Sequence, residues 1–155
     1  HLASRVKQEV VISPTTMSDS VSGTRSGYTG IYNFYNIGAT NTTSGSAVNN
    51  GLKWASTGTS YLRPWNSRYR SIVGGAIYIG EKYINVGQNT SYLQKFNVTE
   101  KNRYNHQYMS NIEAPNSEAT KTASAYSATL NEMTLVFSIP VYTNMPEEVS
   151  PIPTK

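Results

Sequence analysis

The sequence predicts an α+β domain that is mainly helical, with a small lobe of strand and loop in its first third. Two observations predict the helical part, because residues 2–10 and 68–84 both repeat apolar side chains at the period of a helix. A third predicts the lobe, because residues 13–30 are rich in Ser, Thr and Gly and lack helical periodicity. A chain of 155 residues is long enough for one such domain with its own core.

The opening segment, HLASRVKQEV, predicts a helix with a carboxylate at the border of its buried face. Leu2, Val6 and Val10 recur at intervals of four residues and form an apolar stripe. At about 100° per residue, Glu9 falls at the edge of that stripe. Arg5, one turn earlier, could pair with Glu9 on a half-exposed helix, or it could point to another partner such as a backbone carbonyl. Because the pattern is under way at the first residue, we expect the helix to have been cut from a longer protein.

The strongest helical pattern lies in residues 68–84, after a shorter candidate helix at 47–56. Asn66 or Ser67 is a suitable N-cap for the longer helix. Its predicted apolar face consists of Tyr69, Ile72, Val73, Ala76, Ile77, Gly80, Tyr83 and Ile84. Three glycines lie inside this helix, at Gly74, Gly75 and Gly80. Each costs about 1 kcal/mol, so we expect them to permit close approach by another segment or a ligand.

Two aromatic stretches lie between the helices, and the first is expected to be strand-like, with Tyr32 and Phe34 on one face and Asn33 and Tyr35 on the other. Residues 31–39 form a compact aromatic stretch that ends in a turn. Residues 87–98, which follow the long helix, are expected to form a polar loop with scattered aromatic side chains.

The last third of the chain predicts one helix and one strand. The helix is expected at 114–130, capped near Asn116 or Ser117. Residues 133–142 are typical of an edge strand, because they contain a proline, which cannot donate to a ladder. The Pro-rich residues 143–155 are typical of a tail or linker. This order of elements matches the lysozyme-like architecture, in which a carboxylate ending the first helix faces the small lobe across a substrate cleft.

The composition narrows the class of ligand. Charged residues make up 14% of the chain, and twelve tyrosines stand against three phenylalanines. Tyrosine offers an apolar face with a hydroxyl edge, which suits a cleft for sugar rings or peptides. The net charge of +4 suits a polyanionic cell wall, but without a Lys/Arg cluster no nucleic acid is expected. With no cysteine, no long apolar run and no metal-ligand spacing, we expect no disulfide, membrane span, metal or cofactor.

Six segments resemble, in the same order, the catalytic domain of bacterial cell-wall β-N-acetylglucosaminidases, the glucosaminidase family of autolysins, and most closely its clostridial members. The segments are HLASRVKQEV, GYTGIYNFYNIGA, NGLKWA, SIVGGAIYIGEKYINVGQNTSYLQKFNV, YNHQYMSNIEAP and FSIPVYTNMP. GQNT-x-YLQKFNV followed by HQYM-x-NI is the most specific part, because it requires a long order of residues. The resemblance implies an N-terminally truncated catalytic domain over residues 1–142, followed by the Pro-rich tail or linker over 143–155.

The resemblance also implies roles for individual residues. It places the catalytic acid at Glu9 and sets Tyr108, in the HQY triplet, beside the scissile bond. It implies that the YNFYNIGA segment lines the sugar cleft, and Asp19 is the one carboxylate that the early lobe offers as a second acid. The residues expected to bind substrate are Tyr28, Tyr35, Asn36, Gln88, Asn89 and Tyr92. The pair at 88–89 could alternatively serve only to form a turn.

The residues themselves are compatible with these catalytic roles and, for some of them, with purely structural roles. A proton donor for a leaving oxygen needs a carboxyl whose pKa is raised by partial burial, which the stripe-edge position of Glu9 suits. Because Arg5 would lower this pKa if it paired with Glu9, we expect Arg5 to point elsewhere, for instance to a backbone carbonyl. Tyr108 could equally be a core tyrosine with a satisfied hydroxyl. In a strand-like segment, His106 and Tyr108 are two residues apart and would point to the same side of the backbone. His106 is expected to have a structural role. Glu81 is expected on a solvated helix flank, and Glu118 in the first turns of a helix, where acidic groups favour the dipole.

The expected function is that of a secreted cell-wall enzyme, a monomeric domain of a larger modular protein that acts on peptidoglycan glycan strands. It would cleave the β-1,4 bond between N-acetylglucosamine and N-acetylmuramic acid. The alternatives are a muramidase or lytic transglycosylase on the same fold, and a wall-binding module that has lost catalysis. Two mechanisms stay open: retention assisted by the substrate's acetamido group, which we favour, and inversion with Asp19 as base on a closing lobe.

Overall fold

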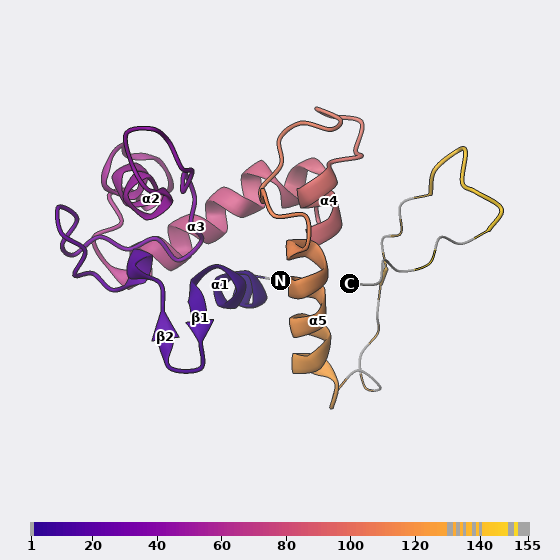
Figure 1. The fold of residues 1–155 in the computed structure, drawn as a ribbon, viewed down its shortest axis with the longest axis horizontal. Coiled ribbons are helices and arrows are strands. Elements are labelled where there is room, and N and C mark those ends of the chain that lie inside the picture. Colours follow the sequence, from indigo (N-terminus) through magenta and orange to yellow (C-terminus); the bar gives the residue numbers. More distant parts are fainter. Residues whose placement is uncertain are drawn as a thin grey trace.

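A computed structural model of the chain describes residues 2–129, 132, 134, 136, 137, 139, 141–148 and 151. The elements follow one another in the order α1 (Leu2–Val10), β1 (Val11–Ser13), β2 (Thr16–Met17), η1 (Asp19–Val21), α2 (Ala47–Ser56), η2 (Ser60–Leu62), α3 (Arg68–Lys82), η3 (Ile84–Val86), α4 (Ser91–Phe96) and α5 (Ala114–Tyr126), where η marks a 3-10 helix (Figure 1). The described part is therefore mainly helical with one small sheet, which agrees with the predicted α+β class.

The small lobe begins with a two-stranded antiparallel sheet that follows α1 without a break. Val11 on β1 pairs with Met17 on β2. Ser18 then donates its backbone N–H to the carbonyl of Val10 at 2.8 Å, which ties the end of the hairpin back to the end of α1. The segment 13–30 is expected to be a loop or a short hairpin, and the structure has a hairpin that starts earlier, at Val11, and ends at Met17.

The core lies where α1, the stretch 31–39 and α3 meet. Its most buried apolar side chains are Val10, Val21, Phe34, Tyr35, Ile37, Ala55, Trp65 and Ile79. Neighbouring elements hold the backbone of the stretch in turns, since the N–H of Tyr32 donates to the carbonyl of Trp65 at 3.0 Å. The N–H of Phe34 likewise donates to the hydroxyl of Ser71 at 3.1 Å. This aromatic stretch therefore reaches the core without forming a strand.

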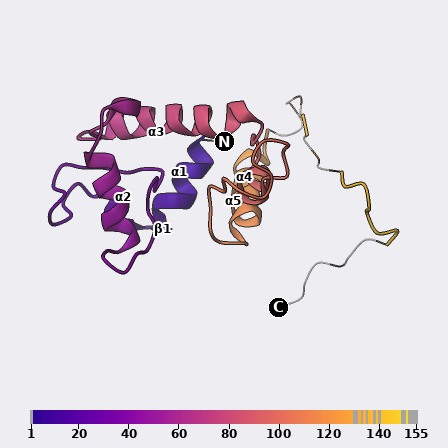
Figure 2. The ribbon, with the colours of Figure 1, turned by 90° about the horizontal axis from the view of Figure 1, so that it is seen from above.

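Helix α3 runs along one side of the fold, with α1, α2, α4 and α5 on the other (Figure 2). Ser67, one of the two predicted caps, is confirmed, because its side chain accepts the backbone N–H of Arg70 at 3.2 Å. The helix ends at Lys82, two residues before the predicted end, because Tyr83 leaves the helical conformation and η3 follows.

The buried face of α3 differs from the predicted face. Tyr69, Ile72 and Ile77, which the apolar period placed inside, are 70%, 41% and 48% exposed. The helix instead buries Ser71, Gly74, Gly75 and Ile79. The prediction is wrong for these three side chains, but Ala76 and Ile84 pack against the core and Tyr83 is buried, as predicted.

Two of the three glycines in α3 are close-approach positions. A Cβ atom added at Gly75 would lie 2.1 Å from Cδ2 of Tyr35, and one added at Gly74 would lie 2.0 Å from the carbonyl oxygen of Tyr61. No side chain larger than hydrogen fits at either position without a shift. At Gly80, a Cβ would meet nothing within 4 Å, so the expectation that another segment approaches closely is wrong there.

The region predicted as a polar loop, 87–98, contains a helix, α4. Thr90 caps it by accepting the N–H of Leu93 at 3.1 Å. The next helix, α5, starts at Ala114 with Pro115 in its first turn, ahead of the caps expected at 116 or 117. Helix α5 packs against both α1 and α4.

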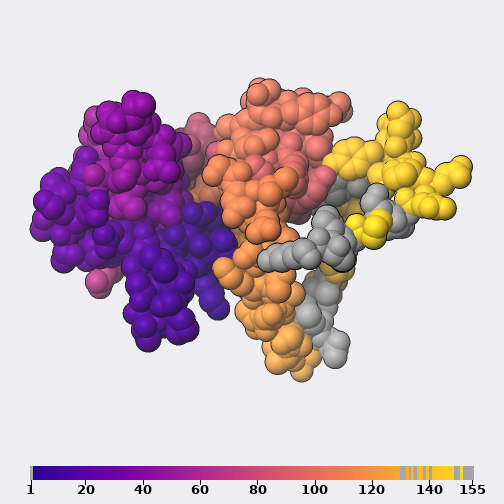
Figure 3. All heavy atoms as spheres, in the orientation of Figure 1, coloured from indigo at the N-terminus to yellow at the C-terminus, as the bar shows by residue number. Residues whose placement is uncertain are grey.

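The predicted edge strand at 133–142 and the tail at 143–155 fall partly outside the described residues. None of the described positions in 133–142 belongs to a strand. The hydroxyl of Tyr142 hydrogen-bonds that of Tyr92 on α4. In the space-filling view, the described part of this segment, in yellow, lies at one edge of the molecule (Figure 3).

Candidate active site

A cleft of about 280 Å³ lies between the end of α1, the stretch 35–39 with the first residues of α2, and the segment 108–114, with Ser18 at its border. Its polar lining residues are Gln8, Glu9, Ser18, Tyr35, Asn36, Tyr108, Ser110 and Asn111. Among the described residues that line it, Glu9 alone carries a carboxylate. Amides and hydroxyls supply the other polar side chains, and such groups suit an uncharged ligand rich in hydroxyl and amide groups.

Glu9 lies in the last turn of α1 and is half-buried, as its place at the stripe edge predicts. Asn36 holds it from the opposite wall, because its Nδ2 atom donates to the Glu9 carbonyl at 2.7 Å and to Glu9 Oε2 at 3.2 Å. Burial raises the pKa of Glu9 above its usual 4.5 and outweighs the Asn36 hydrogen bond and the Arg5 charge, which lower it. The carboxyl is thus suited to donate a proton.

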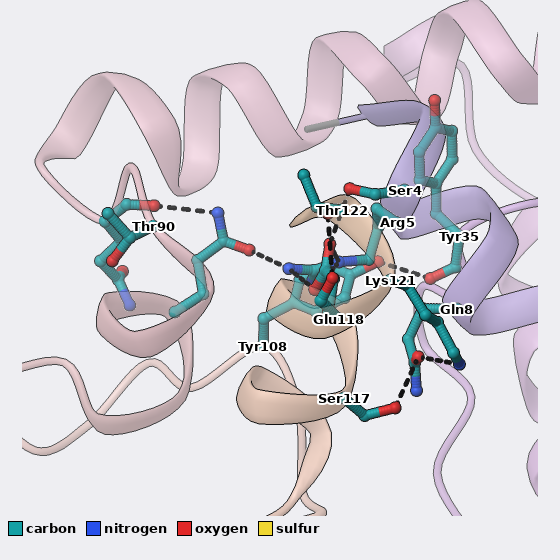
Figure 4. Close-up of polar contacts among 12 residues, drawn as sticks. Ser4, Arg5, Gln8, Tyr35, Thr90, Tyr108, Ser117, Glu118, Lys121 and Thr122 are labelled. Atoms are coloured by element: carbon teal, nitrogen blue, oxygen red, sulfur yellow. Dashed lines mark hydrogen bonds and ion pairs between the residues drawn. The ribbon is translucent and has the colours of Figure 1, made fainter. Parts of the chain in front are cut away.

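Arg5 does not pair with Glu9. It is fully buried and forms an ion pair with Glu118 of α5, with 2.9 Å between Nη2 and Oε2. The same Nη2 atom donates to Oε1 of Gln94 on α4 at 2.6 Å. The expectation that Arg5 points away from Glu9 is confirmed, but the expected backbone carbonyl partner is wrong, and so is the assignment of Glu118 to a helix-dipole role alone. Figure 4 shows Arg5, Glu118 and Tyr108 gathered beside α5.

Tyr108 lies at the cleft with its hydroxyl already engaged. The hydroxyl donates to the carbonyl oxygen of Tyr35 at 2.5 Å, and Cζ of Arg5 lies 4.3 Å from the centre of the phenol ring. Burial, and secondarily the charge of Glu9, raise the pKa of Tyr108 well above 10, so the phenol stays protonated. Because its proton is donated to Tyr35, the oxygen retains lone pairs that can accept a hydrogen bond from a ligand.

His106 has the structural contacts expected of it. Its ring stacks on Tyr83 with 4.5 Å between centroids, and its Nδ1 lies 2.9 Å from Oε1 of Gln88. Tyr108 contacts the same Tyr83 ring edge-on at 5.1 Å. The two side chains therefore share a side, as predicted, but the backbone there is not a strand, and His106 has a left-handed φ of 57°.

The other residues expected to bind substrate are spread over the molecule. Tyr35 lines the cleft, but its ring is only 2% exposed and packs on Gly75. Gln88 is 1% exposed and donates to the carbonyls of Leu93 and His106, both at 3.0 Å, which fits the alternative role in forming a turn. Asn89 is exposed and, like Gln88, does not line the cleft.

Tyr28 and Tyr92 also lie away from the cleft lining. Tyr28 is half-buried in the early lobe, where its carbonyl accepts the N–H of Ile31 at 3.0 Å. Tyr92 lies near a larger hollow of about 690 Å³ that the residues around Tyr104 and the described tail enclose. No carboxylate or imidazole is among the described residues that line this hollow, so it lacks a group for acid–base chemistry.

Asp19, the candidate second acid, lies at the start of η1, next to the cleft-lining Ser18. Its side chain is 62% exposed and pairs with Nη1 of Arg25 at 2.9 Å. Nε of Arg25 in turn donates to Oδ1 of Asn49 on α2 at 3.0 Å. Asp19 is therefore tied to the outside of the lobe and is not among the residues that line the cleft.

Sequence reasoning missed the partners of Arg5. Gln94 lies in a segment predicted as a loop, and Glu118 lies more than a hundred residues from Arg5. A polar spacing in the sequence cannot reveal a contact of this kind, because it depends on how α4 and α5 pack on α1. Among the described residues, no group of three or more His, Asp or Glu side chains could hold a metal ion. The described helices are also too short or too polar to cross a membrane.

Comparison with known proteins adds a relationship. The chain is 32% identical over 111 residues, or 72% of its length, to the bifunctional autolysin of Staphylococcus epidermidis ATCC 12228. It is 36% identical over 78 residues, half of its length, to the bifunctional autolysin of Staphylococcus aureus MSSA476. The chain is autolysin-related.

It spans only 8% and 6% of the length of these two autolysins, so it corresponds to a small part of each. No family model matches the chain. No solved structure matches it either, so the lysozyme-like arrangement stays a prediction.

Proposed function

We propose that the chain is a peptidoglycan hydrolase that cleaves the β-1,4 bond between N-acetylglucosamine and N-acetylmuramic acid, as part of a secreted, cell-wall-associated protein. The observation that carries the proposal is Glu9, a carboxyl with a burial-raised pKa in a cleft otherwise lined by neutral groups. The similarity to proteins named autolysins supports a role in lysis of the wall. The net charge of +4 favours binding to a polyanionic wall.

In this proposal Glu9 is the general acid. Cleavage of the C1–O4 bond leaves an alkoxide, which is a poor leaving group near neutral pH, so the oxygen must receive a proton as the bond breaks. Burial keeps a larger fraction of Glu9 protonated, and Asn36 fixes the carboxyl while leaving Oε1 for the substrate. The neutral cleft wall adds no second charge that would compete for this proton.

The second group of the reaction is proposed to come from the substrate. A protein nucleophile would lie about 5–5.5 Å from the acid and an inverting base about 6.5–9.5 Å away. Asp19, the candidate for either role, is paired with Arg25 and does not line the cleft. The acetamido oxygen of the sugar would therefore attack C1 as the C1–O4 bond breaks. Water would then attack C1 and give one proton to the Glu9 carboxylate. The bond between C1 and the acetamido oxygen would break in the same step.

Tyr108 is proposed to orient that acetamido group. Because the Tyr108 hydroxyl donates to the carbonyl of Tyr35, its oxygen is an acceptor for the acetamido N–H. An acceptor there would turn the acetamido oxygen towards C1. The proposed fold is the lysozyme-like one, in which α1 carries the acid and the segment with Asn36, together with the start of α2, lies across the cleft from it.

The test is a digest of purified peptidoglycan, reduced with borohydride and analysed by mass spectrometry, with the wild type and two variants. The wild type is expected to yield N-acetylglucosaminitol at the new ends, and Glu9→Gln to lower turnover at least about a hundredfold. Glu81→Gln is the matched control, because Glu81 is on α3 with a side chain 56% exposed and away from the cleft. Reduced muramitol would indicate a muramidase, anhydro ends a transglycosylase, and binding without any products a wall-binding module.

A further inference from the structure

The buried ion pair between Arg5 and Glu118 lies one helical turn behind the proposed acid. Nε of Arg5 lies 3.1 Å from both carboxylate oxygens of Glu118, and Nη2 lies 2.9 Å from Oε2. The two side chains are 0% and 1% exposed. Salt in the solvent therefore screens this pair far less than it would a surface pair.

The position of Arg5 creates a difficulty for an acid at Glu9. On a helix, residues four apart lie on the same face, so the guanidinium of Arg5 is on the side of α1 that Glu9 borders. A bare cation there would favour the ionised form of Glu9, which cannot donate a proton. Yet Arg5 joins α1 to Gln94 on α4, to Glu118 on α5 and to the ring of Tyr108, so the packing of three helices depends on it.

We propose that Glu118 is a positioning residue that holds the guanidinium of Arg5 against α5 and offsets its charge, so that Glu9 remains a protonated donor. The proposal rests on the function proposed above, in which Glu9 is the acid. Glu118 acts through Arg5 and does not touch the substrate, because it is not among the residues that line the cleft.

The other groups around Glu9 do not supply this compensation. Asn36 faces Glu9 with a neutral amide, and Tyr108 carries a phenol that stays protonated. Lys121 of α5 donates to Oε1 of Gln8 at 2.6 Å, so its ammonium group is directed to that amide. Consistent with this geometry, Arg5 lowers the pKa of Glu9 and Glu118 raises it.

The test is the dependence of kcat/KM on pH, measured with soluble peptidoglycan oligosaccharides. Glu118→Gln removes the negative charge and keeps the side-chain length, so the alkaline limb is expected to move to lower pH. The ratio of activity at about pH 5 to that at about pH 7.5 should rise at least about threefold over the wild type. Glu118→Asp keeps the charge and should keep the limb in place, even though a shorter side chain weakens the packing.

Arg5→Met tests the proposal from the opposite side. It removes the charge that favours ionised Glu9, so the alkaline limb should move to higher pH, whatever happens to the maximal rate. Loss of one partner of a buried pair destabilises a fold, so circular dichroism is recorded for each variant and the folded one of the two is decisive. A purely structural pair would lower the melting temperature in both variants and leave the limb where it is in the wild type, which would overturn the proposal.

A failure of the proposed function can be distinguished from a failure of the proposed role of Glu118. A wild type that releases no reduced sugar from peptidoglycan contradicts the function itself. A wild type that does, combined with a folded Glu118→Gln variant whose limb is unmoved, contradicts only the role of Glu118. Glu81→Gln removes an exposed glutamate and controls for the general effect of lost negative charge.

Discussion

Substitution of Gly75 by alanine tests how α3 packs on the core beneath the cleft. The new Cβ would lie 2.1 Å from Cδ2 and 2.6 Å from Cε2 of Tyr35. Carbon atoms in contact prefer about 3.5–4.0 Å, so the ring or the helix must move by more than an ångström. Tyr35 is 2% exposed, so neighbouring atoms already cover nearly all of its surface. Overpacking of this kind costs about 1–3 kcal/mol, against a gain of about 1 kcal/mol from the better helix former.

The matched control is Gly80→Ala in the same helix, where the Cβ would meet nothing within 4 Å. It should stabilise the protein by about 1 kcal/mol through helix propensity alone. The measurement is urea unfolding of both variants and the wild type. Relative to the wild type, the urea concentration at the midpoint should fall for Gly75→Ala and rise for Gly80→Ala, while the dependence of the unfolding free energy on urea stays unchanged. A Gly75→Ala variant as stable as Gly80→Ala would refute the packing of α3 on Tyr35. Activity should fall with Gly75→Ala, because the Tyr35 carbonyl positions Tyr108.

Three further predictions concern the cleft. Because burial raises the pKa of Glu9, the folded state holds that proton more tightly than the unfolded state, and the wild type loses this stabilisation as pH rises through the raised pKa. Glu9→Gln should therefore melt at a higher temperature than the wild type at about pH 8, with the difference shrinking towards about pH 4; a constant difference would contradict the raised pKa. Tyr108→Phe removes the hydrogen bond to Tyr35 and should lower the free energy of unfolding by about 1 kcal/mol. Its activity should fall by more than this small loss of stability explains, whereas a stable and fully active variant would show that Tyr108 has a packing role only. Asp19→Asn should leave the rate nearly unchanged, and NMR should show that the first product anomer retains the configuration of the substrate. Inversion together with a collapsed rate would show that Asp19 leaves Arg25 and acts as the base.

Features that depend on short stretches of sequence could be predicted. The helix at 2–10 with Glu9 at its border follows from periodicity, and the cap at Ser67 follows from the side chain that sits before an apolar pattern. α2 (Ala47–Ser56) coincides with the segment expected to hold a short helix. Each of these depends on neighbours within one or two turns, which the sequence displays directly.

Features that depend on packing between distant segments could not be predicted from the sequence. The six residues of α4 are too few to show a repeat, so that helix was expected as a loop. The apolar period of α3 places Ile72 and Ile77 inside, but both are exposed, because the close approach of Tyr35 to Gly75 turns the glycine side of the helix to the core. The partner of Arg5 depends on the meeting of α1 with α5, and no periodicity encodes that contact.

The bonds from Asn36 to Glu9 set a limit on what variation the cleft can tolerate. One amide group serves both the main chain and the carboxyl of Glu9, on a residue whose φ of 50° lies in the left-handed region. Glycine would accept that backbone but supply no donor, and aspartate would present a second acceptor to two oxygen atoms. Asparagine meets both demands, whereas Asn89 is exposed and lies outside the cleft lining, so neither demand applies to it. In a saturation library selected for wall lysis, position 36 should therefore return almost a single residue, and position 89 should return many.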